Sequence, residues 1–188
     1  MSYTKLNIKS LIAGVLIGLG VIINTLTSIP ILGALLFSFG LLTIIALQLP
    51  LYTGKIGFIG KEKGLCLILI SNLIGIAFCI ALYCIANPGT WLLISQAAAI
   101  KFTKSFLAMF IYGVFCGMLI HFAVKTKEKP YLTSMAVIIF ILIGAEHCIA
   151  AFPFLLAAFN LTNLIKFIMI ILGNSVGAIL LEKGLSYE

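Results

Sequence analysis

The amino-acid sequence predicts an all-α integral membrane protein with six transmembrane helices. Of its 188 residues, 63% are apolar and only 9% are charged, whereas soluble domains carry about 25% charged residues. Six apolar stretches are each long enough for the roughly 20 residues that a membrane-spanning helix needs. They cover residues 10–28, 31–50, 64–87, 103–124, 131–157 and 163–182. The joints between them are short, so we expect a single transmembrane domain over residues 1–188.

The charged residues predict how these helices are oriented. All twelve basic residues are lysines. With six crossings, most of them fall on one side, namely Lys5, Lys9, Lys55, Lys61, Lys63, Lys125, Lys127, Lys129 and Lys183. Only Lys101, Lys104 and Lys166 fall on the other side, so the positive-inside rule places both termini in the cytoplasm of a cell with this protein in its plasma membrane. The net charge of +7 then reflects topology and attraction to lipid headgroups, and it is no sign of a nucleic-acid partner.

The first helix resembles a signal peptide only superficially. Its apolar stretch is too long, and no Ala-x-Ala cleavage site follows it. Gly14 and Gly18 lie four residues apart on this helix, and small residues at that spacing let helix backbones approach closely in lipid. We therefore expect helix 1 to pack tightly against a neighbouring helix.

The second helix is predicted to be interrupted. Its apolar character begins after Pro30 and continues beyond residue 50 to about Ile59. A continuous helix of that length would reach about 45 Å, whereas the hydrocarbon core is about 30 Å thick. Pro50 and Gly54 are the natural points for a break, near residues 50–55.

The third and fourth helices carry packing motifs and few polar groups. Helix 3 contains Ser71-Asn72-Leu73-Ile74-Gly75, and helix 4 contains Gly113 and Gly117. His121 lies near the cytoplasmic end of helix 4, where we expect an interfacial or packing role. The cysteines fall inside apolar stretches with spacings that fit neither a disulfide framework nor a metal site. They are Cys66, Cys79, Cys84, Cys116 and Cys148.

The fifth helix holds the most informative residues of the chain. The segment from Pro130 to about Phe159 is overlong, and it contains Gly144-Ala145-Glu146-His147-Cys148-Ile149-Ala150, so a second interruption is predicted near residues 144–151. Glu146 is the single acid that lies well inside an apolar stretch, and ionisable groups at membrane depth usually mark a pathway or relay. His147 could exchange protons near neutral pH, or it could be a structural histidine at the helix break.

The sixth helix completes an internal repeat. It contains Gly173-Asn174-Ser175-Val176-Gly177, which is similar to Ser71-Asn72-Leu73-Ile74-Gly75 of helix 3. The glycine pair of helix 4 is likewise similar to the glycine pair of helix 1. These matches indicate two related halves of three helices, at about 8–87 and 101–183. Since three is odd, the second half must enter the membrane from the opposite side, which makes an inverted repeat. Sites in such folds form near the midplane at interrupted helices, and unwound backbone survives there only where protein or a water-filled cavity satisfies it.

Together these motifs resemble the formate/nitrite transporter family, whose members are pentameric channels with a pore between inverted three-helix repeats. The matching segments, in order, are Ser10–Val15, Phe37–Leu41, Leu51-Tyr52-Thr53-Gly54, Asn72–Gly75, Lys101 with Phe106 and Gly113, Gly144–Ala150 and Gly173–Gly177. The resemblance implies an aquaporin-like protomer, a homo-pentamer, and passage of a small monovalent anion or its conjugate weak acid, such as formate, nitrite or hydrosulfide. It implies no cofactor and no bound metal.

The resemblance also implies roles for individual residues. His147 would be the central pore histidine, with Thr53, and with Tyr52 beside it, on the opposite loop. Glu146 and Lys101, which would begin helix 4, would tune the charge of the substrate pathway. The apolar constrictions on either side would be Phe37, Leu41, Leu51 and Phe140. A bare anion cannot cheaply cross such constrictions, so a proton from water or from His147 would make it a neutral acid.

The chain departs from the family's pattern at four positions, Pro50, Lys55, Gly117 and Ala151.

A different class of membrane protein has the same size, because substrate-binding membrane subunits of vitamin uptake systems also have six helices in about 190 residues. Such a subunit would use the helix 1 glycines to dock on a partner, but it would not explain the repeat or the broken helices. An enzyme is not expected, since no nucleophile–base pair is present.

Overall fold

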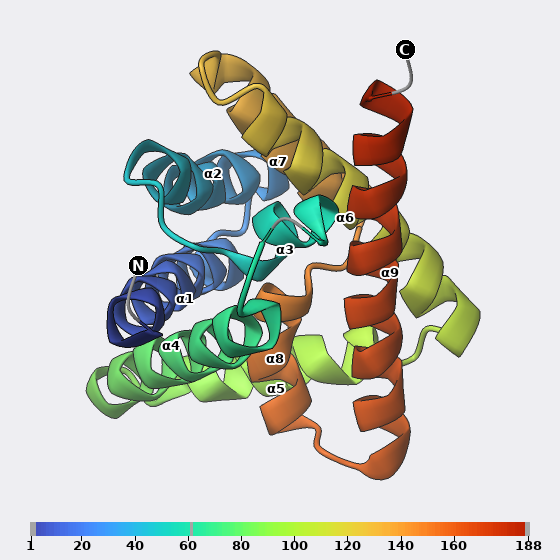
Figure 1. Cartoon of the computed structure of the whole chain (residues 1–188). Coiled ribbons are helices and arrows are strands. Elements are labelled where there is room, and N and C mark those ends of the chain that lie inside the picture. The colour runs from blue at the N-terminus through green and yellow to red at the C-terminus, as the bar shows by residue number, and fades with distance from the viewer. Residues whose placement is uncertain (1–2, 61, 187–188) are drawn as a thin grey trace.

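The computed structural model describes residues 3–60 and 62–186, which form helices joined by short segments (Figure 1). In chain order they are α1 (Tyr3–Leu26), α2 (Pro30–Ala46), α3 (Tyr52–Lys55), the short 3₁₀ helix η1 (Ile56–Phe58), α4 (Leu65–Ala86), α5 (Gly89–Lys101), α6 (Phe106–Lys125), α7 (Pro130–Leu142), α8 (Cys148–Ala157) and α9 (Leu161–Leu185). Lys61, one of the lysines used for the orientation, lies outside the described residues.

Four of these helices, α1, α4, α6 and α9, are long and apolar enough to cross a bilayer. They form two packed pairs, α1 with α4 and α6 with α9. Glycine makes both contacts possible, because an added Cβ at Gly14 would overlap the carbonyl of Asn72, and one at Gly117 would overlap the carbonyl of Asn174. Close backbone approach of this kind is how helices gain packing energy in lipid. The tight packing expected for helix 1 is therefore made against α4.

The interruption predicted within the second helix is present, and it begins a few residues earlier than the expected residues 50–55. The helix α2 ends at Ala46, and residues 47–51 are not helical. Gln48 adopts a left-handed backbone conformation with φ of 52°, and the residue before Pro50 is disfavoured in a helix. These two features turn the chain out of α2 ahead of Pro50. Gly54, which we expected to help break the helix, lies inside the short helix α3.

The second interruption is also present, and its position agrees more closely with the predicted residues 144–151. The helix α7 ends at Leu142, and Gly144 has φ of 70°, the left-handed conformation in which helices commonly terminate. The next helix, α8, begins at Cys148 with His147 as its N-cap residue. The break thus covers residues 143–147. In Figure 1 the short helices α3 and α8 lie at the centre of the arrangement, with longer helices around them.

The prediction of a short, non-helical connection between helices 3 and 4 is wrong. A 13-residue helix, α5, occupies most of that connection. Lys101 is the last residue of α5 and so does not begin the following helix. That helix, α6, starts after Ser105, whose Oγ accepts a hydrogen bond from the backbone N–H of Ala108 at 3.2 Å. Serine is a preferred residue for this capping position. The count of six crossings stays a prediction, since α2, α7 and α8 are only 10–17 residues long.

Candidate functional site

The ends of the two interrupted segments meet at a hydrogen bond between Thr53 and His147. Thr53 Oγ1 lies 2.9 Å from Nε2 of His147, and both residues are buried. The other ring nitrogen of His147, Nδ1, accepts a hydrogen bond from the backbone N–H of Ala150 at 3.1 Å. Nδ1 therefore carries no proton, and the neutral ring donates its Nε2–H to Thr53. The hydroxyl hydrogen of Thr53 is then not used in this hydrogen bond.

Asn72 of α4 holds the first interruption in place. Its side-chain Oδ1 accepts from the backbone N–H of Tyr52 at 2.9 Å. Its Nδ2 donates to the carbonyl of Pro50 at 3.1 Å and to that of Ser10 in α1 at 2.6 Å. One buried amide thus satisfies two backbone groups that the break leaves without helical partners, the Tyr52 N–H and the Pro50 carbonyl, and ties them to α1 through Ser10.

Asn174 of α9 does the same for the second interruption. Its Oδ1 accepts from the backbone N–H of Cys148 at 2.8 Å. Its Nδ2 donates to the carbonyl of Glu146 at 2.7 Å and to that of Gly113 in α6 at 2.9 Å. In both halves the asparagine binds the first residue of the second helical piece, the residue two positions before it, and a carbonyl of the neighbouring long helix.

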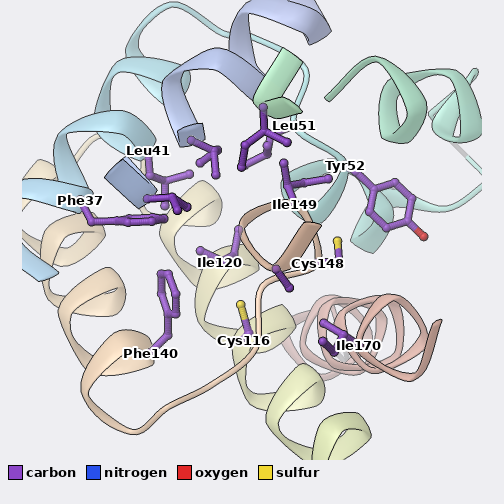
Figure 2. Close-up of a cluster of buried hydrophobic side chains, with 14 of the residues drawn as sticks. Phe37, Leu41, Leu51, Tyr52, Cys116, Ile120, Phe140, Cys148, Ile149 and Ile170 are labelled. Atoms are coloured by element: carbon purple, nitrogen blue, oxygen red, sulfur yellow. The ribbon is translucent and has the colours of Figure 1, made fainter. Parts of the chain in front are cut away.

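Four buried apolar side chains belong to the same hydrophobic cluster, and one of them packs on His147. The rings of Phe37 and Phe140 meet edge to face, with centroids 5.9 Å apart, and the ring of Phe140 lies 6.3 Å from that of His147. Leu41, next to Phe37, and Leu51 are fully buried in the same cluster (Figure 2). The four residues that the resemblance names as constrictions are therefore gathered at one place.

Two cavities approach this cluster, and they share no lining residue. The smaller, of about 170 Å³, is lined by Phe37, Phe140 and His147. The larger, of about 580 Å³, is lined by Leu41 and Leu51. Phe37 and Leu41 are one turn apart on α2, so the cavities lie at successive levels along this helix. The Thr53–His147 pair and the apolar side chains separate them.

Charged groups lie in the smaller cavity. The carboxylate of Glu146, which is 1% exposed, forms ion pairs with Lys101 through Oε2 and with Lys104 through Oε1, the latter at 2.6 Å. The ammonium groups also lie 5.1 Å from the ring centres of Phe154 and Tyr112 respectively. Two positive charges and one negative charge leave this cavity with one net positive charge.

Sequence reasoning placed Lys101 near the site but missed Lys104. The available signal was their spacing of three residues, which puts two lysines close together on the less basic side of the chain. Nothing local to the sequence indicated that both reach the same carboxylate, because Glu146 comes from a segment more than 40 residues later. The contact depends on how α5 and α6 pack against the second interruption.

Tyr52 lies at the edge of the cluster, with its ring directed outward from it (Figure 2), and it lines neither cavity. Its hydroxyl is 2.9 Å from Oγ of Ser175 in α9, and its backbone N–H is held by Asn72. The side chain therefore ties α3 to α9, and a place for it in the substrate pathway has no geometric support.

Three of the departures from the family's pattern have a structural account. Gly117 packs directly on the backbone of Asn174, so no larger side chain fits there. Lys55 is paired with Glu62 at 2.7 Å, which offsets the charge that it brings to the larger cavity. Ala151 lines the smaller cavity and adds no polar group to it.

A central break in two helices, a buried threonine–histidine pair and a cavity on either side of it are features of a membrane channel or transporter. The chain matches the model of the formate/nitrite transporter family over residues 1–187 and belongs to this family, as the sequence predicted. It is a multi-pass membrane protein, and this membership argues against the vitamin uptake alternative.

Two solved structures resemble the chain over almost its whole length. One is described as a pentameric formate channel with formate bound, with 21% identity, a TM-score of 0.78, and coverage of 97% of this chain and 95% of that chain. The other is described as an FNT family ion channel, with 21% identity, a TM-score of 0.80, and coverage of 97% and 89%. At this identity they establish the shared fold. No curated protein matches the sequence.

Proposed function

We propose that this protein is a channel for small monovalent anions that pass the centre as their conjugate weak acids. The observation that carries the proposal is the Thr53–His147 hydrogen bond, buried between two cavities and flanked by apolar side chains. A charged solute pays a large desolvation cost at such a place. A neutral acid does not, and it can exchange hydrogen bonds with the two side chains as it passes.

The smaller cavity supplies the first step of this mechanism. Lys101 and Lys104 outnumber the single carboxylate of Glu146, and a net positive charge in a narrow cleft raises the local concentration of anions. Near the apolar rings of Phe37 and Phe140, the lower dielectric favours the protonated form of the solute. The proton comes from water, or from His147 after its ring has first taken up a second proton, because the neutral ring can donate a hydrogen bond but not its last proton.

We further propose six membrane crossings in two inverted repeats, with α2 to η1 as one crossing and α7 with α8 as another. The matched hydrogen bonds of Asn72 and Asn174 support the repeat. The lysine distribution supports cytoplasmic termini, which makes the larger cavity, with Lys55, Lys125 and Lys127, the cytoplasmic one. The relative described as a pentameric formate channel supports a homo-pentamer.

Flux measurements on the purified protein in liposomes test the proposed function. Formate, nitrite, hydrosulfide, fluoride and acetate would be compared, with empty liposomes as the control for passive leakage of the acids. We expect saturable flux of at least one of these anions, faster at acid pH. Flux no greater than that of empty liposomes for every anion, from protein of correct oligomer size, would contradict the proposal.

A further inference from the structure

Asn24 is a polar side chain of the smaller cavity that has no part in the proposed mechanism. It lies in the last turn of α1 and lines this cavity. The residue is half-buried, and its side-chain amide has no hydrogen-bond partner among the described residues. Sequence reasoning gave it no role. A polar group in such a place costs free energy unless it is hydrogen-bonded, so the amide is available to a solute that enters the cavity.

Two glycines determine where this amide lies. A Cβ added at Gly33 of α2 would lie 2.7 Å from Oδ1 of Asn24, so a larger residue at position 33 would push the amide away. Gly20, one turn before Asn24 on the same face of α1, packs on the ring of Phe37. The amide is therefore placed one helical turn beyond the Phe37 constriction, on the side of the smaller cavity.

The other polar side chains of this cavity are already engaged. Both carboxylate oxygens of Glu146 accept from lysines, and both ring nitrogens of His147 form hydrogen bonds within the protein. The lysines themselves have no acceptor atom. Among the described side chains that line the cavity, Oδ1 of Asn24 is therefore the acceptor that has no donor. A protonated acid brings such a donor, its O–H group.

The chemistry of an amide distinguishes between small acids. An amide presents its donor and its acceptor side by side. A neutral acid of the form HO–X=O, such as formic or nitrous acid, presents an acceptor and a donor at the matching spacing, so it can form two hydrogen bonds to the amide at once. Hydrogen fluoride and hydrogen sulfide carry donor and acceptor on a single atom and form one at a time. The lysines do not distinguish between these solutes, because an ammonium group acts as a compact point charge.

We propose that Asn24 is a specificity-determining residue of the smaller cavity, where it binds the neutral form of an oxygen acid through paired hydrogen bonds. Its Nδ2 donates to the doubly bonded oxygen of the acid, and its Oδ1 accepts from the O–H. The acid then keeps two hydrogen bonds as it leaves the lysines and approaches Phe37, whose ring offers none. This inference rests on the proposed function, because it concerns a solute on its way to the constriction.

Selectivity of flux in liposomes tests this inference. Asn24→Leu keeps the approximate volume of the side chain and removes both of its hydrogen-bonding groups. We expect flux of formate and nitrite to fall by about 2-fold to 10-fold relative to flux of fluoride and hydrosulfide, which is the effect of one additional net hydrogen bond. Because the solutes are compared on the same variant, a loss of active protein cancels from the ratio.

Two further variants provide a second arm and the matched control. Gly33→Ala keeps the amide but displaces it, and it should lower the same ratio, with little loss of stability because the atom that must move is the end of a flexible side chain. Thr27→Val also changes a polar side chain packed near Gly33, but Thr27 lines neither cavity, so its ratio should be that of wild type. An unchanged ratio in Asn24→Leu would overturn the inference, as would an equal change in Thr27→Val.

Failure of the proposed function would give a different result from failure of the inference. Flux of fluoride or hydrosulfide without flux of formate or nitrite would overturn the inference alone. If only formate and nitrite are carried, their flux through Asn24→Leu is compared with that through Thr27→Val, and equal flux would overturn the inference.

If none of the four solutes is carried, the proposed function is contradicted and binding of formate decides the inference. A ligand that binds the folded protein raises its melting temperature. In detergent at acid pH, formate should then raise the melting temperature of the wild type more than that of Asn24→Leu, with chloride at equal concentration as the reference. An equal rise in both proteins would overturn the inference as well.

Discussion

The two ring nitrogens of His147 make different hydrogen bonds, one structural and one in the proposed pathway. Substitutions can therefore remove one hydrogen bond and keep the other. Nδ1 caps α8 by accepting from the N–H of Ala150, and Nε2 donates to Thr53. A residue that replaces only the first task preserves the local fold and removes the proposed contact with the solute. The pore role of this histidine can therefore be separated from its structural role.

His147→Asn should keep the fold and impair transport. Asparagine is a preferred N-cap residue, but its shorter side chain does not reach Thr53. We expect flux of a weak acid to fall by about 5-fold to 100-fold, since leaving a buried group without its hydrogen-bond partner costs about 1–3 kcal/mol. The rise of flux at acid pH, expected for wild type, should be altered. Liposome flux between about pH 5 and 8 measures both effects.

His147→Phe removes the cap and the donor together, so its effect should be more severe. Size-exclusion chromatography must first establish that the variant assembles as wild type does. A correctly assembled His147→Phe protein with normal, pH-dependent flux would show that the histidine is structural and that the proposed pathway lacks its central residue.

The two lysines at Glu146 should have separable effects on charge and on stability. Lys101→Ala or Lys104→Ala leaves the buried carboxylate one partner and lowers the net charge of the smaller cavity from one positive charge to none. Flux should fall chiefly at low substrate concentration and low ionic strength, because salt screens long-range attraction. The double variant leaves a buried charge unpaired, which costs about 3–5 kcal/mol, so it should also unfold at lower temperature.

Lys166→Ala is the matched control for the lysine variants. Lys166 lies on the same side by the predicted topology, but it donates to the carbonyl of Phe102 and lines neither cavity. Its removal should leave the salt dependence of flux unchanged. If Lys101→Ala and Lys104→Ala behave like this control at every ionic strength, the lysines are interfacial and do not attract the solute.

At the scale of helices, the sequence predicted the long elements better than their ends. Hydropathy located the four long helices, because burial in lipid requires continuous apolar stretches. Excess length combined with Pro50 and Gly144 predicted both interruptions. The end of α2 was missed because it depends on the left-handed backbone conformation of Gln48, and a glutamine in the sequence does not predict that conformation.

Two other features were missed for different reasons. The mixed composition of α5 is typical of a connecting segment. The Glu146–Lys104 contact is tertiary, so no local pattern predicts it.

Asn72→Ala and Asn174→Ala should both destabilise the interruptions. Each substitution leaves one carbonyl and one N–H of the break without a partner in a buried place, at a cost of about 1–3 kcal/mol for each group. We expect a lower melting temperature and a loss of flux, since Thr53 and His147 follow directly on the residues that these amides hold. Thermal unfolding in detergent and liposome flux are the two measurements.

Asn160→Ala serves as the matched control for these two variants. Asn160 caps α9 by accepting from the N–H of Asn163 at 2.9 Å, so its loss should cost about 1 kcal/mol of stability. Asn160 is exposed and lines neither cavity, so the flux of this variant should be that of wild type. If Asn160→Ala loses as much flux as Asn72→Ala and Asn174→Ala, any loss of stability stops transport, and the buried asparagines have no specific role in the pathway.

At the scale of the whole molecule, the glycines that the sequence placed on helix faces are used within the protomer. They join α1 to α4 and α6 to α9, so contacts between protomers must be made by larger apolar side chains. Many of these are exposed, for example Phe39, Phe78 and Leu107. Native mass spectrometry in mild detergent should give a pentamer. A monomer alone, from protein that is active in liposomes, would contradict the expected assembly.

The number of crossings is the property of the whole molecule on which the pathway depends. The cavities lead from one side of the membrane to the other only if α2 to η1 and α7 with α8 each cross it. If only the four long helices crossed, the segments after α5 and after α6 would exchange sides. Thr103 and Lys127 lie in those two segments, and both are exposed, so each is a reporter whose location differs between the two topologies.

Single cysteines at these positions should distinguish six crossings from four. In a background with the exposed Cys66 replaced by serine, Thr103→Cys should react with a membrane-impermeant maleimide added to intact cells, and Lys127→Cys should react only after the membrane is opened. The reason is the lysine bias, from which we expect Lys125, Lys127 and Lys129 to lie in the cytoplasm. The opposite pattern would mean that α2 and α7 enter and leave on one side. The Thr53–His147 pair would then join two re-entrant segments, with no conduit between the cavities.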